Sequence, residues 1–301
     1  MSLIESALEK LRRGAEADSD TRHGDSRAAN SVPQPAKVAV VIPPEVEEPR
    51  RRLTMDIKAL RDAGYLPEEG LERRFADHYR QIKRPVVEKA LAGPSEMRIV
   101  LVSSALPGDG KTFTSINLAL SMARERDISV LLVDADGPRS RLSEVLGIRS
   151  EPGLLDALAD ESVDLESLIL RTDIRGLDVL PAGRFIENST ELLASVRMRE
   201  IAARLVARNP RRLVLFDSAP LLVSSEARVL LSIPGQILLV VRAGVTPRQA
   251  ILEAVGYVEK TKLQGLILNQ THFQKGSGYY DYGSYGKSEG QSGSPTQDPP
   301  E

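Results

Sequence analysis

One stretch of the chain decides its fold: Ala105-Leu106-Pro107-Gly108-Asp109-Gly110-Lys111-Thr112. An apolar run, residues 99–102, comes directly before it, and a helical pattern, residues 115–120, follows it. A strand, a glycine-containing turn, the Gly-Lys-Thr triplet and a helix together form a phosphate-binding loop. Gly108 and Gly110 let successive backbone N–H groups point inward, and the helix N-terminus adds its partial positive charge. We therefore expect a nucleotide to bind here.

The side chains of this loop indicate how the nucleotide would be held. Lys111 can reach the β- and γ-phosphates, and the Thr112 hydroxyl can ligate Mg²⁺. Ala105 stands where the strict pattern has glycine, and an ordinary glycine turn between a strand and a helix is the alternative. On the nucleotide interpretation, the binding residues are Pro107, Gly108, Asp109, Gly110, Lys111, Thr112 and Phe113.

The composition excludes several classes of site. The 301 residues carry a net charge of −2, which gives no argument for binding nucleic acid or a membrane surface. The chain has no cysteine, which excludes disulfides, thiolate metal sites and a cysteine nucleophile. No apolar run approaches the ~20 residues that span a bilayer, and the N-terminus lacks the layout of a signal peptide. We expect a cytoplasmic protein that a docking partner can hold at the inner membrane.

Changes in composition divide the chain into four parts. The pattern of residues 1–13 predicts an amphipathic helix. Because so short a helix is barely stable in isolation, we expect it to dock on its own domain, on a partner or on lipid. Residues 14–52 predict a proline-rich, disordered linker, although a short apolar run within it could pair as an edge strand. Residues 53–275 predict a nucleotide-binding domain that begins with helices. Residues 276–301 predict a flexible tail, because they are rich in Gly, Ser, Pro and Gln.

The first helices of this domain carry two further signals. The pattern is helical from Leu53 to Ala92, pauses near residues 64–67, and meets a break or a new helix start at Arg84-Pro85. Three-residue spacing also places one acid and two bases on one helix face. That face is either solvated or a contact between subunits, and its residues are Asp77, Arg80 and Lys83.

From residue 98 onward, short apolar strands alternate with helices. One helix is expected to run from a capping box at Asn188 and Glu191 to about Arg208. Such crossovers predict an α/β fold in which helices wrap a mostly parallel sheet and ligands bind at the carboxyl ends of the strands. With the phosphate-binding loop, these crossovers predict a P-loop NTPase fold, and the chain resembles the deviant-Walker, MinD-like type. The expected strands are residues 98–103, 129–134, 177–181, 212–217, 236–242 and 263–269.

Two of these strands end in acidic residues. Residues 130–136 contain Asp134 and Asp136, and residues 213–220 contain Asp217. Beside a phosphate-binding loop, one such carboxylate can hold Mg²⁺ through water and another can accept a proton from the nucleophile. An aspartate that closes a single strand is often only a helix cap, but two such ends in one chain favour catalysis.

The tail supplies a candidate nucleophile. Four of the seven tyrosines gather in a glycine-rich segment that could enter the active site of a neighbouring subunit. A tyrosine hydroxyl has an ordinary pKa of about 10, and Asp136 or Asp134 would have to take its proton. The alternatives are water as the nucleophile and a low-complexity tail without a catalytic role. The clustered residues are Tyr279, Tyr280, Tyr282 and Tyr285.

This combination of motifs resembles the bacterial tyrosine kinases, the cytoplasmic tyrosine autokinases of exopolysaccharide loci. The likeness covers residues 80–285, with residues 131–136 as the second Walker A motif and residues 213–220 as Walker B. The phosphate-binding loop and the tyrosine cluster complete it. Residues 1–11 resemble the branch of this family that is found with exosortase systems.

The resemblance implies an ATP-dependent kinase that phosphorylates its tail tyrosines in trans within a homo-oligomeric ring. It implies a membrane polysaccharide co-polymerase, a Wzz-type chain-length determinant, as activator, a protein-tyrosine phosphatase as a second partner, and no nucleic acid. Thr112, Asp134 and Asp217 would hold Mg²⁺, and Asn269, at the end of the last strand, would contact adenine. The implied catalytic residues are Lys111, Asp134, Asp136 and Asp217.

Two positions depart from the family pattern. Asp77, Arg80 and Lys83 stand for its Glu-x-x-Arg-x-x-Arg subunit-contact motif, which puts ring assembly through this motif in question. Pro138 stands where the second Walker A motif usually has arginine, and the loop geometry there is expected to differ.

Two other functions fit parts of the sequence. An ATPase of the same fold without kinase activity, similar to the chromosome-partitioning and division-site-placing proteins, would carry a signature lysine where this chain has Leu106. A regulatory scaffold that binds ATP and uses its tail as a docking peptide would have no need of Lys111, Thr112 and three aspartates.

Overall fold

The structure is a computed structural model that describes residues 51–137, 139–184 and 186–271. The predicted N-terminal helix, most of the predicted linker and the tyrosine-rich tail lie outside these residues and stay predictions. None of the helices in the described part contains an apolar stretch of the length that a bilayer requires.

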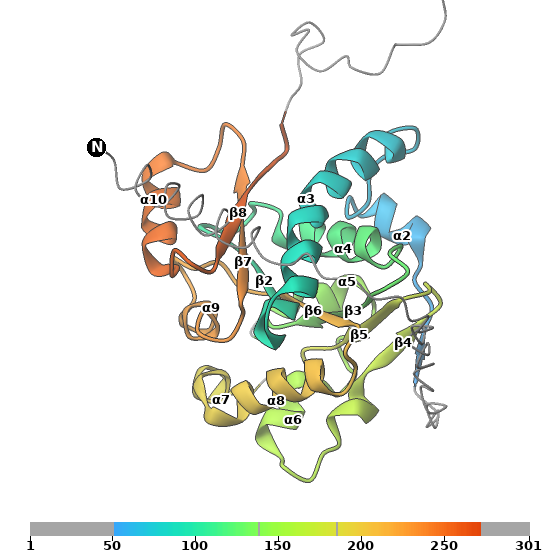
Figure 1. Ribbon diagram of the computed structural model, residues 1–301, viewed down its shortest axis with the longest axis vertical. Coiled ribbons are helices and arrows are strands. Elements are labelled where there is room, and N and C mark those ends of the chain that lie inside the picture. The colour runs from blue at the N-terminus through green and yellow to red at the C-terminus, as the bar shows by residue number, and fades with distance from the viewer. Residues whose placement is uncertain (1–50, 138, 185, 272–301) are drawn as a thin grey trace, which may run out of the picture. The chain divides into compact units, whose positions relative to one another are not determined.

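An eight-stranded sheet forms the centre of the described domain, in the order β1-β4-β5-β3-β6-β2-β7-β8 (Figure 1). All neighbouring strands pair in parallel except β4 and β5, which form an antiparallel hairpin. The sheet is therefore mostly parallel, as predicted. Its strands are β1 (Arg52–Leu53), β2 (Ile99–Ser104), β3 (Ser129–Asp134), β4 (Leu170–Thr172), β5 (Leu177–Leu180), β6 (Arg212–Asp217), β7 (Gln236–Arg242) and β8 (Leu263–Asn269).

The central strands form because they are continuous apolar runs that are buried on both faces. Every residue of β2 and β6 is buried. Along β2, Ile99 and Leu101 face one core, while Val100 and Val102 face the other. The strands β3, β6, β7 and β8 have the predicted bounds. Strand β2 starts and ends one residue later than predicted, and β5 ends one residue earlier. The short strands β1 and β4 were not predicted, because two or three residues are too few to show a period.

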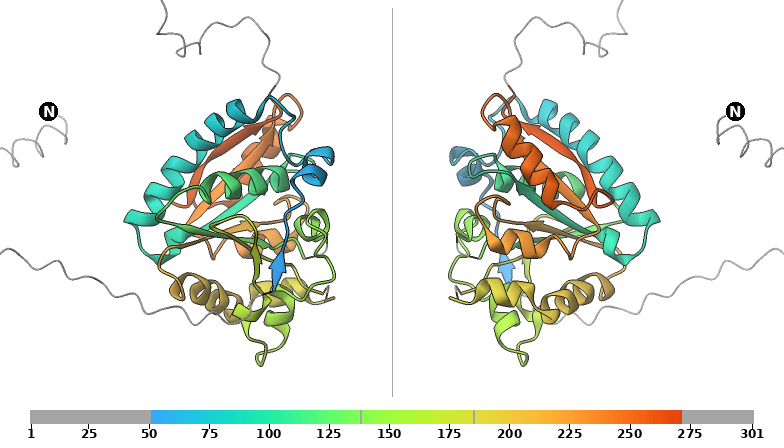
Figure 2. Two further views of the ribbon diagram at one scale, coloured as in Figure 1. Left: turned by 90° about the vertical axis from the view of Figure 1, so that its right-hand side faces the viewer. Right: turned by 90° about the vertical axis from the view of Figure 1, so that its left-hand side faces the viewer.

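Helices cover both faces of the sheet (Figures 1 and 2). Leu60, Val86 and Ile116 come from helices that share one core, and Leu155, Met198 and Ala254 come from helices that share the other. The helices of the first face are α2 (Ile57–Asp62), α3 (Glu72–Ala92), α4 (Lys111–Met122) and α5 (Arg141–Val145), and those of the second are α6 (Leu154–Ala159), α7 (Ser189–Ala194), α8 (Val196–Ala207), α9 (Ser225–Leu230) and α10 (Arg248–Tyr257).

The helix predicted from Asn188 to about Arg208 is wrong, because two helices, α7 and α8, occupy this stretch. Ser195 separates them with an extended backbone, ψ 163°. Its hydroxyl accepts from the Met198 N–H at 3.2 Å and donates to the Leu192 carbonyl at 2.6 Å, which caps α8 and closes α7. Asn188 makes no capping hydrogen bond through its side chain. The capping residue of the longer helix is therefore Ser195.

The predicted break at Pro85 is also wrong, because α3 runs through it without interruption. A proline inside a helix removes one backbone hydrogen bond and costs about 3 kcal/mol. Packing offsets this cost, since Val86 and Ala90 on the next turns are fully or almost fully buried. Tertiary burial thus overrides the local signal.

The three charged residues predicted to share one face of α3, Asp77, Arg80 and Lys83, do not all interact with one another. Asp77 and Arg80 form an ion pair at the surface. Lys83 instead turns inward, is 8% exposed, and donates to the Ser121 carbonyl at 2.8 Å while pairing with Glu125. Lys83 therefore stabilises the C-terminal end of α4 in its own chain, where a cation complements the helix dipole.

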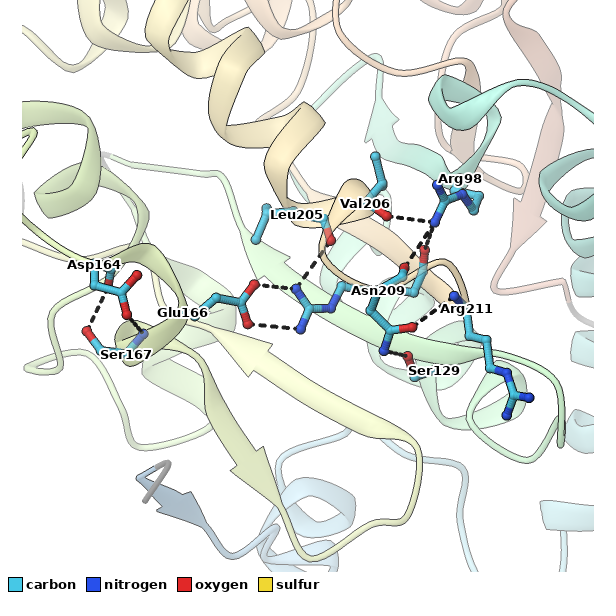
Figure 3. A network of polar contacts seen from close by, with 10 residues as sticks. Arg98, Ser129, Asp164, Glu166, Ser167, Leu205, Val206, Asn209 and Arg211 are labelled. Carbon is cyan, nitrogen blue, oxygen red and sulfur yellow. Dashed lines mark hydrogen bonds and ion pairs between the residues drawn. The ribbon is translucent and has the colours of Figure 1, made fainter. Parts of the chain in front are cut away.

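A network of hydrogen bonds lies at the amino ends of the central strands, opposite their carboxyl ends (Figure 3). Arg212, the first residue of β6, is 3% exposed and binds both carboxylate oxygens of Glu166, at 2.7 and 3.1 Å. Arg98 donates to the carbonyls of Val206 and Asn209 at 2.8 and 3.0 Å, where α8 ends. The network binds the end of α8 to the starts of β2 and β6. Because the strands are rigid, fixing their starts also fixes the position of their carboxyl ends.

We predict that Lys83→Ala lowers the free energy of unfolding by about 1–3 kcal/mol, because it removes a buried ammonium and leaves the Ser121 carbonyl and Glu125 without their donor. Urea denaturation would measure this. Arg80→Ala on the same helix is the control and should change the value by less than about 0.5 kcal/mol, since its ion pair is exposed. Equal losses in the two variants would contradict the inward role of Lys83.

Candidate active site

The phosphate-binding loop connects β2 to α4 and depends on two glycines. Gly108 and Gly110 have φ of 84° and 96°, a left-handed conformation that other residues rarely adopt. A Cβ on Gly110 would also lie 1.9 Å from the Asn269 amide nitrogen. Only glycine therefore fits at position 110, and the N-terminus of α4 starts at Lys111, directly after it.

Asp109 braces this loop from within. Its carboxylate accepts from the Leu106 N–H at 3.2 Å and from the Thr246 hydroxyl at 2.7 Å. The Asn269 amide donates to its carbonyl at 3.0 Å. Asp109 is 3% exposed. The loop is thus tied to the segment after β7 and to the end of β8 before any ligand arrives.

Asp217, at the end of β6, orients the first turn of α4. Its two carboxylate oxygens accept from the Thr112 hydroxyl at 2.8 Å and from the Ser115 hydroxyl at 2.9 Å. The Thr112 oxygen keeps its lone pairs, because it is the donor in this bond. The position suits Thr112 as a direct ligand of a metal ion, with Asp217 acting on the metal through Thr112 or through water.

Asp134, at the end of β3, is held by a residue that the sequence did not indicate. One carboxylate oxygen accepts from the Asp136 N–H at 3.1 Å. The other accepts from both the N–H and the hydroxyl of Ser143, each at 2.7 Å. The Ser143 hydroxyl in turn accepts from the Ala182 N–H at 3.0 Å. Ser143 therefore joins the end of β3 to the segment after β5.

The turn after Asp136 is tightly bent. Ser140 has φ 44° and ψ 44°, and its N–H donates to the Asp136 carbonyl at 2.6 Å. Its hydroxyl donates to the Gly137 carbonyl at 3.0 Å. Pro138, where the family pattern has arginine, lies outside the described residues. The bend starts α5 and thereby sets the position of Ser143.

Burial shifts the pKa values of the ionisable residues in this site. Burial lowers the pKa of Lys111, although Asp217, Asp136 and Asp109 nearby oppose the change. Burial raises the pKa of Asp134 to about 7, with the charge of Asp217 adding to the effect. Burial also raises the pKa of Asp217 to about 6 and that of Asp136 above its ordinary value.

These shifts indicate a site that is short of positive charge. Three strand-end carboxylates share one buried lysine, and an entering cation would relieve their repulsion. Among the described residues, no three His, Cys, Asp or Glu side chains are placed to hold a metal ion by themselves. A divalent cation would fit here only with oxygen ligands from outside the carboxylate set, such as the Thr112 hydroxyl and the phosphates of a nucleotide.

Comparison with known proteins assigns the family. A family model described as an AAA domain matches residues 97–266, more than half of the chain. Tyrosine-protein kinase YwqD of Bacillus subtilis is 32% identical over 191 residues, which cover 63% of this chain and 79% of that protein. The chain belongs to the bacterial tyrosine-protein kinase family. The resemblance seen in its sequence motifs is thereby confirmed.

Other relatives agree with this assignment. The crystal structure of the VpsO kinase domain superposes with a TM-score of 0.56 at 30% sequence identity, and it matches 68% of this chain and all of that domain. Tyrosine-protein kinase wzc of Salmonella typhimurium is 32% identical over 195 residues, but the chain spans only 26% of that longer protein. The predicted α/β P-loop fold of this kinase family member is confirmed.

The structure brings together most of the predicted site residues of this kinase. Phe113 lies beside the loop, and its ring is 6.1 Å from that of Phe75 on α3. Both rings line a cavity of about 570 Å³ that Thr271 also lines. The tyrosine cluster lies outside the described residues. The residues that gather at the strand carboxyl ends are Asp109, Gly110, Lys111, Thr112, Asp134, Asp136, Asp217 and Asn269.

Sequence reasoning missed three hydroxyl residues of the site. Ser115 lies three residues after Thr112 on one helix, a spacing that could have indicated it. Ser143 and Thr246 gave no signal, because they reach Asp134 and Asp109 only through the tertiary fold. All three donate to an aspartate, and they therefore position acids that the sequence did reveal.

We predict that Ser143→Ala lowers the initial rate of ADP formation from ATP by about tenfold, because Asp134 loses the hydroxyl that orients it. The dissociation constant for ATP should change much less, since Ser143 does not belong to the phosphate-binding loop. Ser143→Thr, which keeps the hydroxyl, should restore most of the rate. Ser232→Ala, at an exposed serine, is the control. An equal loss in the alanine and threonine variants would contradict the positioning role.

We also predict that, without nucleotide, the free energy of unfolding depends on pH more strongly in the parent protein than in the variant Asp217→Asn. The folded-state pKa of Asp217, about 6, exceeds the ordinary 3.8, and the folded state binds this proton more tightly than the unfolded state. The free energy of unfolding of the parent therefore falls as pH rises from about 4 to about 7. Between pH 5 and pH 8 the parent should lose about 1–2 kcal/mol more than the variant, which has no such proton.

Urea denaturation at the two pH values, without Mg²⁺ or nucleotide, measures this difference. Asp160→Asn is the control, because the pKa of this exposed carboxyl is lowered and it stays ionised throughout the range. Its curve should run parallel to that of the parent. A parallel curve for Asp217→Asn as well would contradict the raised pKa.

Proposed function

We propose that this chain transfers the γ-phosphoryl group of ATP to the tyrosines of its own C-terminal cluster, on a neighbouring copy of the chain. The observation that carries the proposal is the set of three buried strand-end aspartates around Lys111 and Thr112, in a member of the tyrosine-protein kinase family. The acceptors are Tyr279, Tyr280, Tyr282 and Tyr285.

The residues present fit ATP and Mg²⁺. The backbone N–H groups of residues 107–112 and the Lys111 ammonium suit the phosphates. The Thr112 hydroxyl would hold Mg²⁺ directly, and Asp134 and Asp217 would act on it through water or through their hydrogen-bonded partners. When bound, Mg²⁺ supplies charge neutralisation for the transferring phosphoryl group. The cavity beside Asn269 and Phe113 would receive adenine.

Asp136 is the proton acceptor that the geometry favours. Both oxygens of Asp134 and both oxygens of Asp217 already accept protein hydrogen bonds. The carboxyl of Asp136 has a raised pKa, which makes it a better base than an ordinary aspartate. As the tyrosine oxygen bonds to the γ-phosphorus, the bond to the bridging oxygen of ADP breaks and Asp136 takes the phenol proton.

The proposed setting is the cytoplasmic face of the inner membrane, in a homo-oligomeric ring. A membrane polysaccharide co-polymerase would activate the kinase, a protein-tyrosine phosphatase would reverse it, and both would serve exopolysaccharide synthesis. The exposed Asp77 and Arg80 remain available for a contact between subunits. Lys83 does not, because it is bound to Ser121 and Glu125 of its own chain. A ring of this kinase would therefore rely on other contacts at that position.

The test is mass spectrometry of the full chain after incubation with Mg²⁺ and ATP, with and without the cytoplasmic segment of the co-polymerase. We expect phosphate on the segment 279–285 of the parent. Lys111→Met should lack it, because the phosphates lose their cation. Asp136→Asn should lose most of the transfer while retaining ATP binding, because only the proton acceptor is removed.

Steady ATP hydrolysis without phosphate on any tyrosine, even with the co-polymerase segment present, would overturn the kinase proposal in favour of an ATPase of the same fold. ATP binding with neither hydrolysis nor transfer would favour a regulatory scaffold. Unchanged phosphorylation in Asp136→Asn would contradict the assigned proton acceptor alone.

A further inference from the structure

Helices α2, α3 and α4 cover one face of the sheet (Figure 1). Residues of these three helices and of the turn before β5 line a second large hollow. It has a volume of about 730 Å³. Its floor is apolar and includes Phe75, Leu120 and Ile128. We call it the arginine groove, because its rim carries Arg124, Arg126 and Arg175.

The rim of the arginine groove has an excess of positive charge. The two acids that line it are already paired, Glu72 with Arg61 at 3.3 Å and Glu125 with Lys83. The three rim arginines are exposed, and in the residues that the structure describes none of them forms an ion pair. Guanidinium groups that no carboxylate occupies are available to an anionic ligand.

Two adjoining turns place these arginines together. Arg124 and Arg126 follow the end of α4, and Arg175 lies in the turn between β4 and β5. The turns touch, since a Cβ on Gly176 would lie 2.8 Å from the Ala123 carbonyl, and Gly176 has φ 82°. The Val130 N–H also donates to the Gly176 carbonyl at 2.8 Å. The rim is thus built on fixed backbone beside the start of β3.

The chemistry of the groove selects a ligand that combines aromatic rings with strong anions. Arginine forks bind phosphate oxygens in pairs, and an apolar floor accepts the flat face of a ring. Phosphotyrosine has both parts. We propose that the arginine groove binds residues 276–286 of the same chain after their tyrosines have been phosphorylated, which rests on the proposed kinase function.

The chain length permits this docking within one molecule. Thr271, the last described residue, lines the smaller cavity of about 570 Å³. Phe75 and Tyr79 on α3 line both that cavity and the arginine groove. The groove therefore lies across one helix, a width of about 10 Å, from the start of the tail. From Thr271, an extended chain reaches roughly 27 Å to Tyr279.

Phosphorylation is what creates the charge complementarity. Without it, residues 276–286 contain one acid, Asp281, and no base. Each phosphate adds roughly −1.5 to −2 charges at pH 7. Such a segment is repelled by Asp134, Asp136 and Asp217 and attracted by the rim arginines. The groove would thus remove the product segment from the acidic site and hold it on its own chain.

The test uses a synthetic peptide of residues 276–286 with phosphate on all four tyrosines, and the same peptide without phosphate. The protein is the full chain carrying Tyr279→Phe, Tyr280→Phe, Tyr282→Phe and Tyr285→Phe, so that its own tail cannot be phosphorylated and compete. Fluorescence anisotropy measures the dissociation constants. We expect the phosphopeptide to bind at least about tenfold more tightly than the plain peptide, because its phosphates meet unpaired arginines.

Charge reversal at the rim, Arg124→Glu with Arg126→Glu, should raise the dissociation constant for the phosphopeptide at least about tenfold. The matched control reverses two exposed arginines on α8 at the other face of the sheet, Arg199→Glu with Arg204→Glu, and should leave the dissociation constant unchanged. Thermal unfolding would confirm that the variants are folded.

Equal affinity for both peptides, or an unchanged dissociation constant in the rim variant, would overturn the docking proposal. Because synthesis supplies the phosphates, this result does not depend on kinase activity. Absence of autophosphorylation in the mass-spectrometric test together with tight phosphopeptide binding would overturn the proposed function and leave the groove assignment standing.

Discussion

The pair of hydroxyl-to-carboxylate bonds at Asp217 is the interaction on which the site depends. It joins the end of β6 to Thr112 and Ser115, and so fixes the rotation of α4 relative to the sheet. Asp217 is 1% exposed, which makes each of these bonds costly to lose. The phosphate-binding loop leads directly into α4, so the position of the helix also fixes the position of the loop. Lys111, the first residue of that helix, lies close enough to Asp217 and Asp136 for their charges to act on its pKa.

Burial of Asp134, Asp136 and Asp217 costs stability, because three carboxyl groups are held away from water with one lysine, Lys111, beside them. Burial and the repulsion between neighbouring carboxylates raise the pKa of Asp134 and of Asp217. Hydroxyl groups from α4 hold Asp217 in place, and the Ser143 hydroxyl from α5 holds Asp134. The carboxylate of Asp136 has no such hydroxyl partner among the described residues, and this difference supports the proposal that Asp136 accepts the proton.

The sequence predicted most strands of the sheet, because buried parallel strands are continuous apolar runs. It also predicted where the site lies, because the carboxyl ends of parallel strands meet at the same end of the sheet. It failed where burial overrules local preference. Pro85 stays inside α3 because Val86 and Ala90, on the turns after it, are buried in the core. Lys83 leaves the charged face of α3 because the carbonyl end of α4 attracts it. Neither partner is visible from within α3.

By itself the sequence determined the phosphate-binding loop, the strands beside it and the aspartates that close them. These are local features: a glycine that must adopt a positive φ, an apolar run, a residue at its end. Tertiary structure alone decided that Ser143 orients Asp134, that Thr246 and Asn269 brace Asp109, and that three arginines from two turns share one rim. Such contacts join segments far apart in the chain, and only the packing of helices on the sheet brings them within hydrogen-bonding distance.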